Sequence, residues 1–197
     1  MGWHGQVYSL AGGVAKQTRA RLLAHATPIW LAAPDEFMRW IWIDKFTEFT
    51  SRTSATAVKN VTLAEEQLHD LYPDFPIYPH SLIVEGMAQT AGILVGEAAN
   101  FSEKVILAKI GRATFHQLVR PGDTLTFSAK IEQFSEQGAS ASGTVTTDGK
   151  LVAEIELMFS HIDQNMAGME FPEHNFVFTE QFTELLKTYR AGGSVQI

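Results

Sequence analysis

The feature that most constrains this sequence is a stretch of almost uninterrupted apolar residues that follows a proline-rich segment. Its apolar members recur at the spacing of a helix: Leu82, Ile83, Ala88, Ala91, Leu94, Val95 and Ala98. One polar or small stripe runs along the same helix, made of Glu85, Gln89, Gly92 and Gly96. A helix of this composition is buried on nearly every side, so the rest of the chain must fold around it.

Composition limits what the protein can be. The helix is not a membrane span, because Glu85, Gln89 and Glu97 interrupt a run that would need about 20 apolar residues. The net charge of -7 argues against a nucleic-acid partner. The chain has no cysteine, which excludes thiolate nucleophiles and Cys-ligated zinc and is compatible with a reducing compartment. With 197 residues, we expect one cytoplasmic domain that needs no metal.

Strand patterns lie on both sides of the helix. Phe37–Phe49 alternates large apolar with polar residues and predicts a strand, and Thr53–Val61 predicts a second strand joined to it by a short turn. Further strands are expected at Val105–Thr114, Thr124–Phe134, Ala139–Thr147 and Leu151–His161. The last two flank Asp148-Gly149, a strong hairpin signal. This order predicts an α+β fold in which an antiparallel sheet wraps around one long central helix.

Three other segments have distinct characters. Pro73, Pro76 and Pro79 make a stiff loop before the helix. Residues 1–34 contain no acidic residue, and we favour a short N-terminal extension over a transit peptide there. Residues 163–197 form a C-terminal extension: a loop at 164–178, then a docked helix at Thr179–Tyr189, capped by Thr179, with the apolar face Phe182, Leu185, Leu186 and Tyr189.

Between these extensions, at 35–162, the chain resembles the β-hydroxyacyl-acyl-carrier-protein dehydratases. The blocks that carry the likeness are AVKNVT at 57–62, YPDFPIYP at 72–79 with LIVEGMAQTAG at 82–92, and IGRATFHQLVRPGD at 110–123. The resemblance implies a hot-dog fold and a homodimer whose active sites lie between subunits, with further assembly into a trimer of dimers left open. It also implies an acyl-carrier-protein or coenzyme A thioester as substrate, a narrow acyl tunnel and no cofactor.

The chemistry that the resemblance implies is loss of water from a (3R)-hydroxyacyl thioester to give a trans-2-enoyl product. In the family, a His of one subunit takes the α-proton, and a Glu on the other subunit's central helix handles the departing hydroxyl. Glu85 matches that Glu. Leu71 stands where the family has its His, and His80 stands where it has Gly. A leucine cannot accept a proton, so this chain lacks the usual base.

Three residues are therefore candidate catalytic groups. A buried carboxylate is energetically costly, so a catalytic role explains Glu85 better than a packing role or a hydrogen bond to Gln89. His80 begins the helix and is the leading substitute base, although it could be an exposed residue beside the helix cap. His69 would point to the same side as Leu71 if the chain is extended there, although a solvent-facing loop histidine is the more common outcome.

The remaining candidates concern binding. The resemblance places Tyr78, Pro79, Gln89, Gly92 and Phe115 along the acyl tunnel, with packing as the alternative for the glycine. His116 and the cations Lys109, Arg112 and Arg120 fit ordinary exposed strand residues better than a carrier-binding site.

Three functions remain open from the sequence. The first is a 3-hydroxyacyl-thioester dehydratase, a hydro-lyase with Glu85 as acid and an unconventional base. The second is a hot-dog thioesterase, in which a helix carboxylate activates water against the thioester carbonyl. The third is a non-catalytic acyl-binding or partner subunit that has lost the His.

Overall fold

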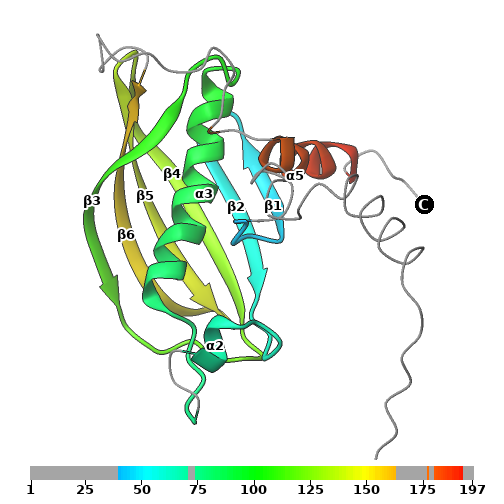
Figure 1. The fold of residues 1–197 in the computed structure, drawn as a ribbon. Helices are drawn as coiled ribbons and strands as arrows, with labels where there is room; N and C mark the ends of the chain where they lie inside the picture. Colours follow the sequence, from blue (N-terminus) through cyan, green and yellow to red (C-terminus); the bar gives the residue numbers. More distant parts are fainter. Residues whose placement is uncertain (1–39, 71–73, 163–176, 178–179, 193–197) are drawn as a thin grey trace, which may run out of the picture. The chain divides into compact units, whose positions relative to one another are not determined.

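The computed structural model describes residues 40–70, 74–162, 177 and 180–192 (Figure 1). The expectations for the N-terminal extension, for Leu71, for the loop at 164–178 and for the Thr179 cap lie outside these residues.

One antiparallel sheet of six strands forms the main layer, in the order β1-β2-β4-β5-β6-β3. Helix α3, His80–Ala98, lies across one face of the sheet (Figure 1). This is the α+β arrangement expected from the sequence. The strands are β1 Lys45–Thr50, β2 Ser54–Asn60, β3 Val105–Phe115, β4 Thr124–Ser135, β5 Gly138–Thr147 and β6 Lys150–His161.

The apolar composition of α3 explains its position. Thirteen of its 19 residues are buried, so its apolar side chains and the inner face of the sheet form a single core. Pro79 precedes its first turn, where a missing N–H costs nothing, and no side chain caps the helix. The cap expected beside His80 is therefore Pro79, without a side-chain hydrogen bond.

The hairpin between β5 and β6 follows from its two turn residues. Asp148 and Gly149 both have positive φ, at 48° and 73°. A two-residue turn of this kind matches the twist of the flanking strands, and Asp-Gly adopts it with little strain. The predicted hairpin is confirmed.

The first predicted strand is wrong at its beginning. β1 begins at Lys45, residues 40–44 have no regular secondary structure, and residues 37–39 lie outside the described part of the chain. The cause is a competing hydrogen bond: the backbone N–H of Trp42 donates to Gln89 Oε1 on α3 at 2.8 Å. The alternation of apolar residues cannot show that a backbone N–H donates to a helix side chain instead of to a neighbouring strand.

The two edges of the sheet differ. β1 is in contact with α5, Glu180–Gly192, whose Leu186 is buried and whose Phe182, Leu185 and Tyr189 pack on the core. The predicted C-terminal helix is thereby confirmed. β3 forms the other edge, and residues 107–113 are exposed one after another. A strand exposed on both sides is available for pairing with another chain.

No helix in the described part of the chain is both long enough and apolar enough to span a membrane.

One glycine of α3 is required by its surroundings. A methyl group at Gly86 would lie 2.6 Å from Phe127 Cζ, and that ring is fully buried. We expect Gly86→Ala to lower the free energy of unfolding by about 1–3 kcal/mol, measured by urea denaturation.

Gly92→Ala is the matched control on the same helix, because a methyl group there would meet the Phe159 ring at an ordinary 3.5 Å. It should lose less than about 1 kcal/mol, since alanine favours a helix over glycine. Equal losses in the two variants would mean that the contact with Phe127 does not set the requirement.

Candidate active site

Glu85 is one of two carboxylates on α3, and the other, Glu97, lies in the last turn and pairs with Arg190. Glu85 lies in the second turn and is half-buried, which corrects the expectation of a fully buried group. Gln89 lies one turn further on, is buried, and donates from Nε2 to Glu85 Oε1 at 2.8 Å. The two side chains therefore share one helix face, as the sequence spacing requires.

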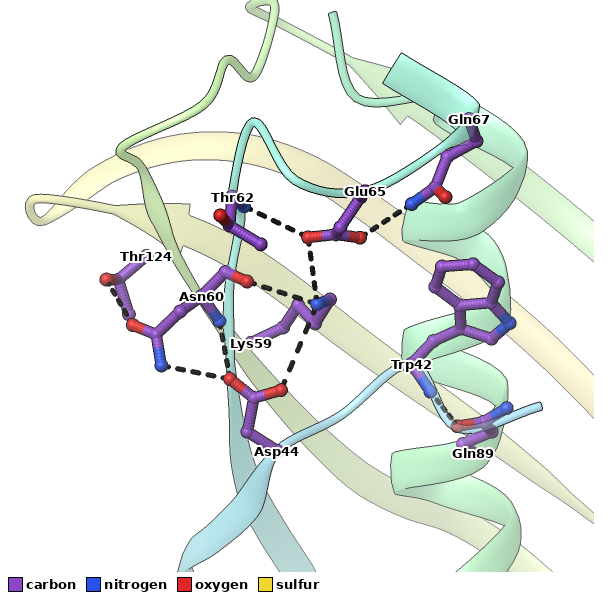
Figure 2. A network of polar contacts seen from close by, with 9 residues as sticks. All are labelled: Trp42, Asp44, Lys59, Asn60, Thr62, Glu65, Gln67, Gln89 and Thr124. Atoms are coloured by element: carbon purple, nitrogen blue, oxygen red, sulfur yellow. Dashed lines mark hydrogen bonds and ion pairs between the residues drawn. The ribbon is translucent and has the colours of Figure 1, made fainter. Parts of the chain in front are cut away.

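The backbone fixes the orientation of the Gln89 amide. The N–H of Trp42 donates to Gln89 Oε1 at 2.8 Å (Figure 2). An amide oxygen that accepts a backbone N–H must turn its NH₂ group the other way, here toward Glu85. Gln89 thus presents a donor to Glu85 Oε1, and Oε2 is the oxygen left to exchange a proton with a bound molecule.

His80 lies at the start of α3, exposed, with its ring stacked on Phe115 of β3. The ring centroids are 4.0 Å apart and the planes differ by 3°. Five residues along a helix correspond to a rotation of roughly 140°, so His80 and Glu85 of one chain point to different sides. The structure does not bring these two predicted catalytic residues together within one subunit.

The expectation of an extended chain at His69 is wrong. His69 lies in α2, Gln67–Asp70, a single helical turn. The N–H groups of Leu68 and His69 donate to the carbonyls of Glu65 and Glu66, at 3.1 Å and 2.9 Å, and these bonds turn the chain. The His69 ring contacts the Leu63 carbonyl oxygen at 2.6 Å.

The predicted binding residues occupy different environments. Tyr78 is 1% exposed, and its hydroxyl has no hydrogen-bond partner among the described residues. Pro79 and Phe115 are half-buried, and Gly92 is buried on the Glu85 side of α3. These positions are consistent with either a tunnel wall or simple packing.

Burial raises the pKa of the Tyr78 hydroxyl well above its ordinary value of 10.0, and the negative charges of Glu65 and Asp44 raise it further. The phenol therefore stays protonated at any physiological pH. It is a potential donor inside the protein rather than a base.

A polar cluster that sequence reasoning missed lies at the end of β2. Lys59 Nζ lies 3.1 Å from Glu65 Oε1 and 3.9 Å from Asp44 Oδ1 (Figure 2). Lys59 lies in the block at 57–62 that resembles the family, and Asp44 and Glu65 lie before and after this block in the sequence. Their sequence spacing does not show that the three side chains meet. Their contact depends on pairing between segments that are distant in sequence.

The outer cations have local partners. Arg112 pairs with Glu156 at 2.7 Å, His116 contacts Glu154 at 3.1 Å, and the Arg120 guanidinium lies 4.5 Å from the centre of the Phe75 ring. The described residues contain no group of carboxylates and histidines able to hold a metal ion.

Comparison with known proteins agrees with this arrangement. Among solved structures, the dehydratase heterocomplex ApeI:P from Xenorhabdus doucetiae aligns with a TM-score of 0.54 and 15% identity, covering 64% of this chain and 90% of that one. The uncharacterized protein PH1136 from Pyrococcus horikoshii aligns with a TM-score of 0.50 and 15% identity, covering 66% and 90%. At such low identity these likenesses show the fold alone, which is the hot-dog fold.

Sequence comparison shows the family. The FabA-like domain matches residues 34–156. The 3-hydroxyacyl-[acyl-carrier-protein] dehydratase FabZ of Solibacter usitatus is 37% identical over 136 residues, which cover 68% of this chain and 83% of that protein. The FabZ of Thiobacillus denitrificans is 40% identical over 123 residues, covering 60% and 85%. The chain belongs to the FabA-like family of β-hydroxyacyl-acyl-carrier-protein dehydratases.

The buried phenol predicts a pH dependence of stability. Because folding raises the pKa of Tyr78, the folded chain holds the phenol proton more tightly than the unfolded chain does. This contribution to stability is complete below about pH 10 and is lost as the pH rises toward the folded-state value. We expect the free energy of unfolding of Tyr78→Phe to fall less steeply with rising pH than that of the wild type.

Urea denaturation at a series of pH values from neutral to about 11 measures this difference. At neutral pH the variant should be as stable as the wild type or slightly more so, since the hydroxyl it loses is buried without a partner. Parallel curves for the two proteins would place the Tyr78 hydroxyl in contact with solvent.

Proposed function

We propose that this protein removes water from 3-hydroxyacyl thioesters to give trans-2-enoyl thioesters. The observation that carries the proposal is a Glu85 carboxylate oriented by Gln89 on the central helix of a chain that belongs to this dehydratase family. The thioester carrier is an acyl-carrier protein, as in the names of the FabZ relatives, or coenzyme A. A reducing compartment such as the cytoplasm suits a chain without cysteine.

The elimination requires two proton transfers. A base takes the proton from the α-carbon, the electron pair of that bond forms the double bond, and the C–O bond at the β-carbon breaks. An acid gives its proton to the departing oxygen, which leaves as water. We assign the acid to Glu85, because Gln89 engages Oε1 and leaves Oε2 to carry the proton.

Histidine suits the remaining role of base, because it exchanges protons near neutral pH. His80 is our candidate, since its ring is exposed and held flat against Phe115, whereas His69 contacts a backbone carbonyl. The His80 that reaches a substrate at Glu85 would belong to a second copy of the chain, because one helix presents the two residues on different sides.

The second copy would pair through β3. The β1 edge is in contact with α5, whereas β3 is open and carries exposed apolar residues with its neighbour β6. They are Leu107, Ile110 and Met158. A two-fold axis beside β3 would bury these residues and extend the sheet from one subunit into the other. We therefore propose a homodimer, and the trimer of dimers remains a prediction.

A second candidate is a non-catalytic acyl-binding or partner subunit, which Leu71 favours. A homodimer of this chain lacks the family's His in both of its sites. Activity would then require a second kind of subunit that supplies the base.

Replacing the acid tests the proposal. Glu85→Gln keeps the shape of the side chain, and its amide oxygen can still accept from Gln89, but it cannot transfer a proton. We expect dehydration of a 3-hydroxyacyl thioester to fall by about 100-fold or more with an unchanged melting temperature. Enoyl absorbance and free thiol should be followed together. Undiminished water loss removes Glu85 from the mechanism, and thiol release without enoyl formation indicates a thioesterase.

Replacing the histidine tests the base. His80→Ala should lower kcat by about 100-fold or more if His80 takes the α-proton. His116→Ala is the matched control, because that histidine is also exposed and contacts Glu154 on the adjacent strand. Leu71→His should raise turnover, because it restores the family's own base. An inert wild type that gains activity only through Leu71→His would instead support the partner-subunit role.

A charge on the open edge tests the dimer. Ile110→Arg places a cation among the exposed apolar residues of β3 and should shift the protein from dimer to monomer in sedimentation velocity. Leu151→Arg changes another exposed apolar residue, at the β5–β6 hairpin, and should leave the dimer intact. A wild-type protein that sediments as a folded monomer would contradict the proposed assembly.

A further inference from the structure

A single buried ammonium group joins two segments that lead to the candidate site. The side chain of Lys59 is 11% exposed, and its Nζ donates to Glu65 Oε1 and to the Asn60 carbonyl oxygen, both at 3.1 Å. Asp44 Oδ1 lies 3.9 Å away on the other side (Figure 2). Among the described residues, Lys59 forms no hydrogen bond or ion pair with Glu85 or Gln89, so any influence on them is transmitted by the chain.

The first segment leads from Asp44 to the reactive carboxylate. Asp44 Oδ2 accepts hydrogen bonds from the backbone N–H of Asn60 at 2.8 Å and from its side chain at 2.9 Å. Two residues earlier, the Trp42 N–H holds Gln89, which in turn holds Glu85. Ile43 between them is buried in the core. The position of Asp44 therefore limits where the Trp42 N–H can lie.

The second segment leads from Glu65 toward position 71. Glu65 Oε1 also accepts from the Thr62 N–H at 3.0 Å, and Oε2 accepts from Gln67 Nε2 at 2.6 Å. Gln67 is the first residue of α2, and residue 71 directly follows α2 in the chain. The Glu65 carboxylate thus organises the turn that precedes the place where the family carries its base.

The burial of Lys59 and Glu65, whose side chains are 11% and 13% exposed, gives their ion pair more weight than the pair with Asp44, whose side chain is 40% exposed. An exposed ion pair contributes about 0–1 kcal/mol. Removing one partner of a buried pair leaves the other charge uncompensated, which is far more disruptive. Reaction rates are also sensitive to position, since displacement of a reacting group by about 1 Å can cost roughly 100-fold.

We propose that Lys59 is a positioning residue for this site: by holding Asp44 and Glu65 together, it fixes both the Trp42–Gln89–Glu85 chain of hydrogen bonds and the turn before residue 71. The inference rests on the proposed function, because it assigns Lys59 to the same reaction. Lys59 itself touches no reacting atom.

The kinetic test compares Lys59→Met with Lys130→Met, which removes a lysine from an exposed pair with Glu132 on β4. Lys59→Met should lower kcat by roughly tenfold to 100-fold and change KM by less than about threefold, because the geometry of catalysis is disturbed rather than binding. Lys59→Arg should recover part of the rate, and Lys130→Met should match the wild type.

A double variant separates position from stability. Lys59→Met/Glu65→Gln removes the charge that Lys59→Met leaves buried, so it should regain most of the lost melting temperature. Its kcat should remain low, because the link between the two segments is still missing. If kcat instead follows the melting temperature through all the variants, Lys59 is only structural and the proposal is wrong.

Backbone amide exchange tests the positioning without any substrate. In the double variant, the Trp42 and Leu68 amides should exchange about tenfold faster or more than in the wild type, while the core amide of Val145 should not change. This readout stays decisive if the protein proves to have no dehydratase activity, which would overturn the proposed function alone. Unchanged exchange at Trp42 and Leu68 would overturn the role of Lys59.

Discussion

The burial of α3 is the constraint on which the rest of this structure depends. Thirteen of its 19 residues are buried, so each buried polar side chain on it requires a partner inside the protein. Thr90 satisfies its hydroxyl by donating to the Gly86 carbonyl at 2.8 Å, and Gln89 satisfies its amide through Glu85 and Trp42. The half-buried carboxylate of Glu85 is therefore held by the buried Gln89 amide, which needs it as a partner.

The sheet accommodates this helix by local departures from regularity. A phenyl ring of β4 lies against Gly86, where no larger residue fits without a shift. Before β1, the Trp42 N–H donates to the Gln89 side chain instead of to a neighbouring strand. Asp44 then returns the chain to the sheet, donating its N–H to the Val58 carbonyl at 2.7 Å. Residues 41–44 thus connect the sheet to the hydrogen bonds that orient the candidate catalytic carboxylate.

Much of the fold could be predicted from the sequence because its signals are local. The helical spacing of apolar residues predicts α3, and Asp148-Gly149 predicts the last hairpin through backbone geometry that those residues favour. Glu85 stands out for a similar reason, as an ionisable residue on an apolar helix, and family resemblance adds its expected role.

The errors arise where distant parts of the chain compete with local preference. The true start of β1 depends on Gln89, which is 47 residues away from Trp42. The helical turn at His69 lies beside a Glu65 carboxylate that also binds Lys59, and no sequence spacing reveals that contact. The half-buried state of Glu85 likewise depends on which segments pass over the helix. Such features require the three-dimensional pairing of segments.

The central claim is that the reacting part of the substrate meets the carboxylate that Gln89 orients. A crystal structure of the Glu85→Gln variant with a bound 3-hydroxyacyl thioester tests this most directly, because the slow variant should retain its substrate. We expect the β-hydroxyl within about 2.6–3.2 Å of the side chain at position 85, with the Gln89 amide still held by the Trp42 N–H. A thioester bound with its β-hydroxyl far from position 85, or a Gln89 amide turned away from it, would contradict the account.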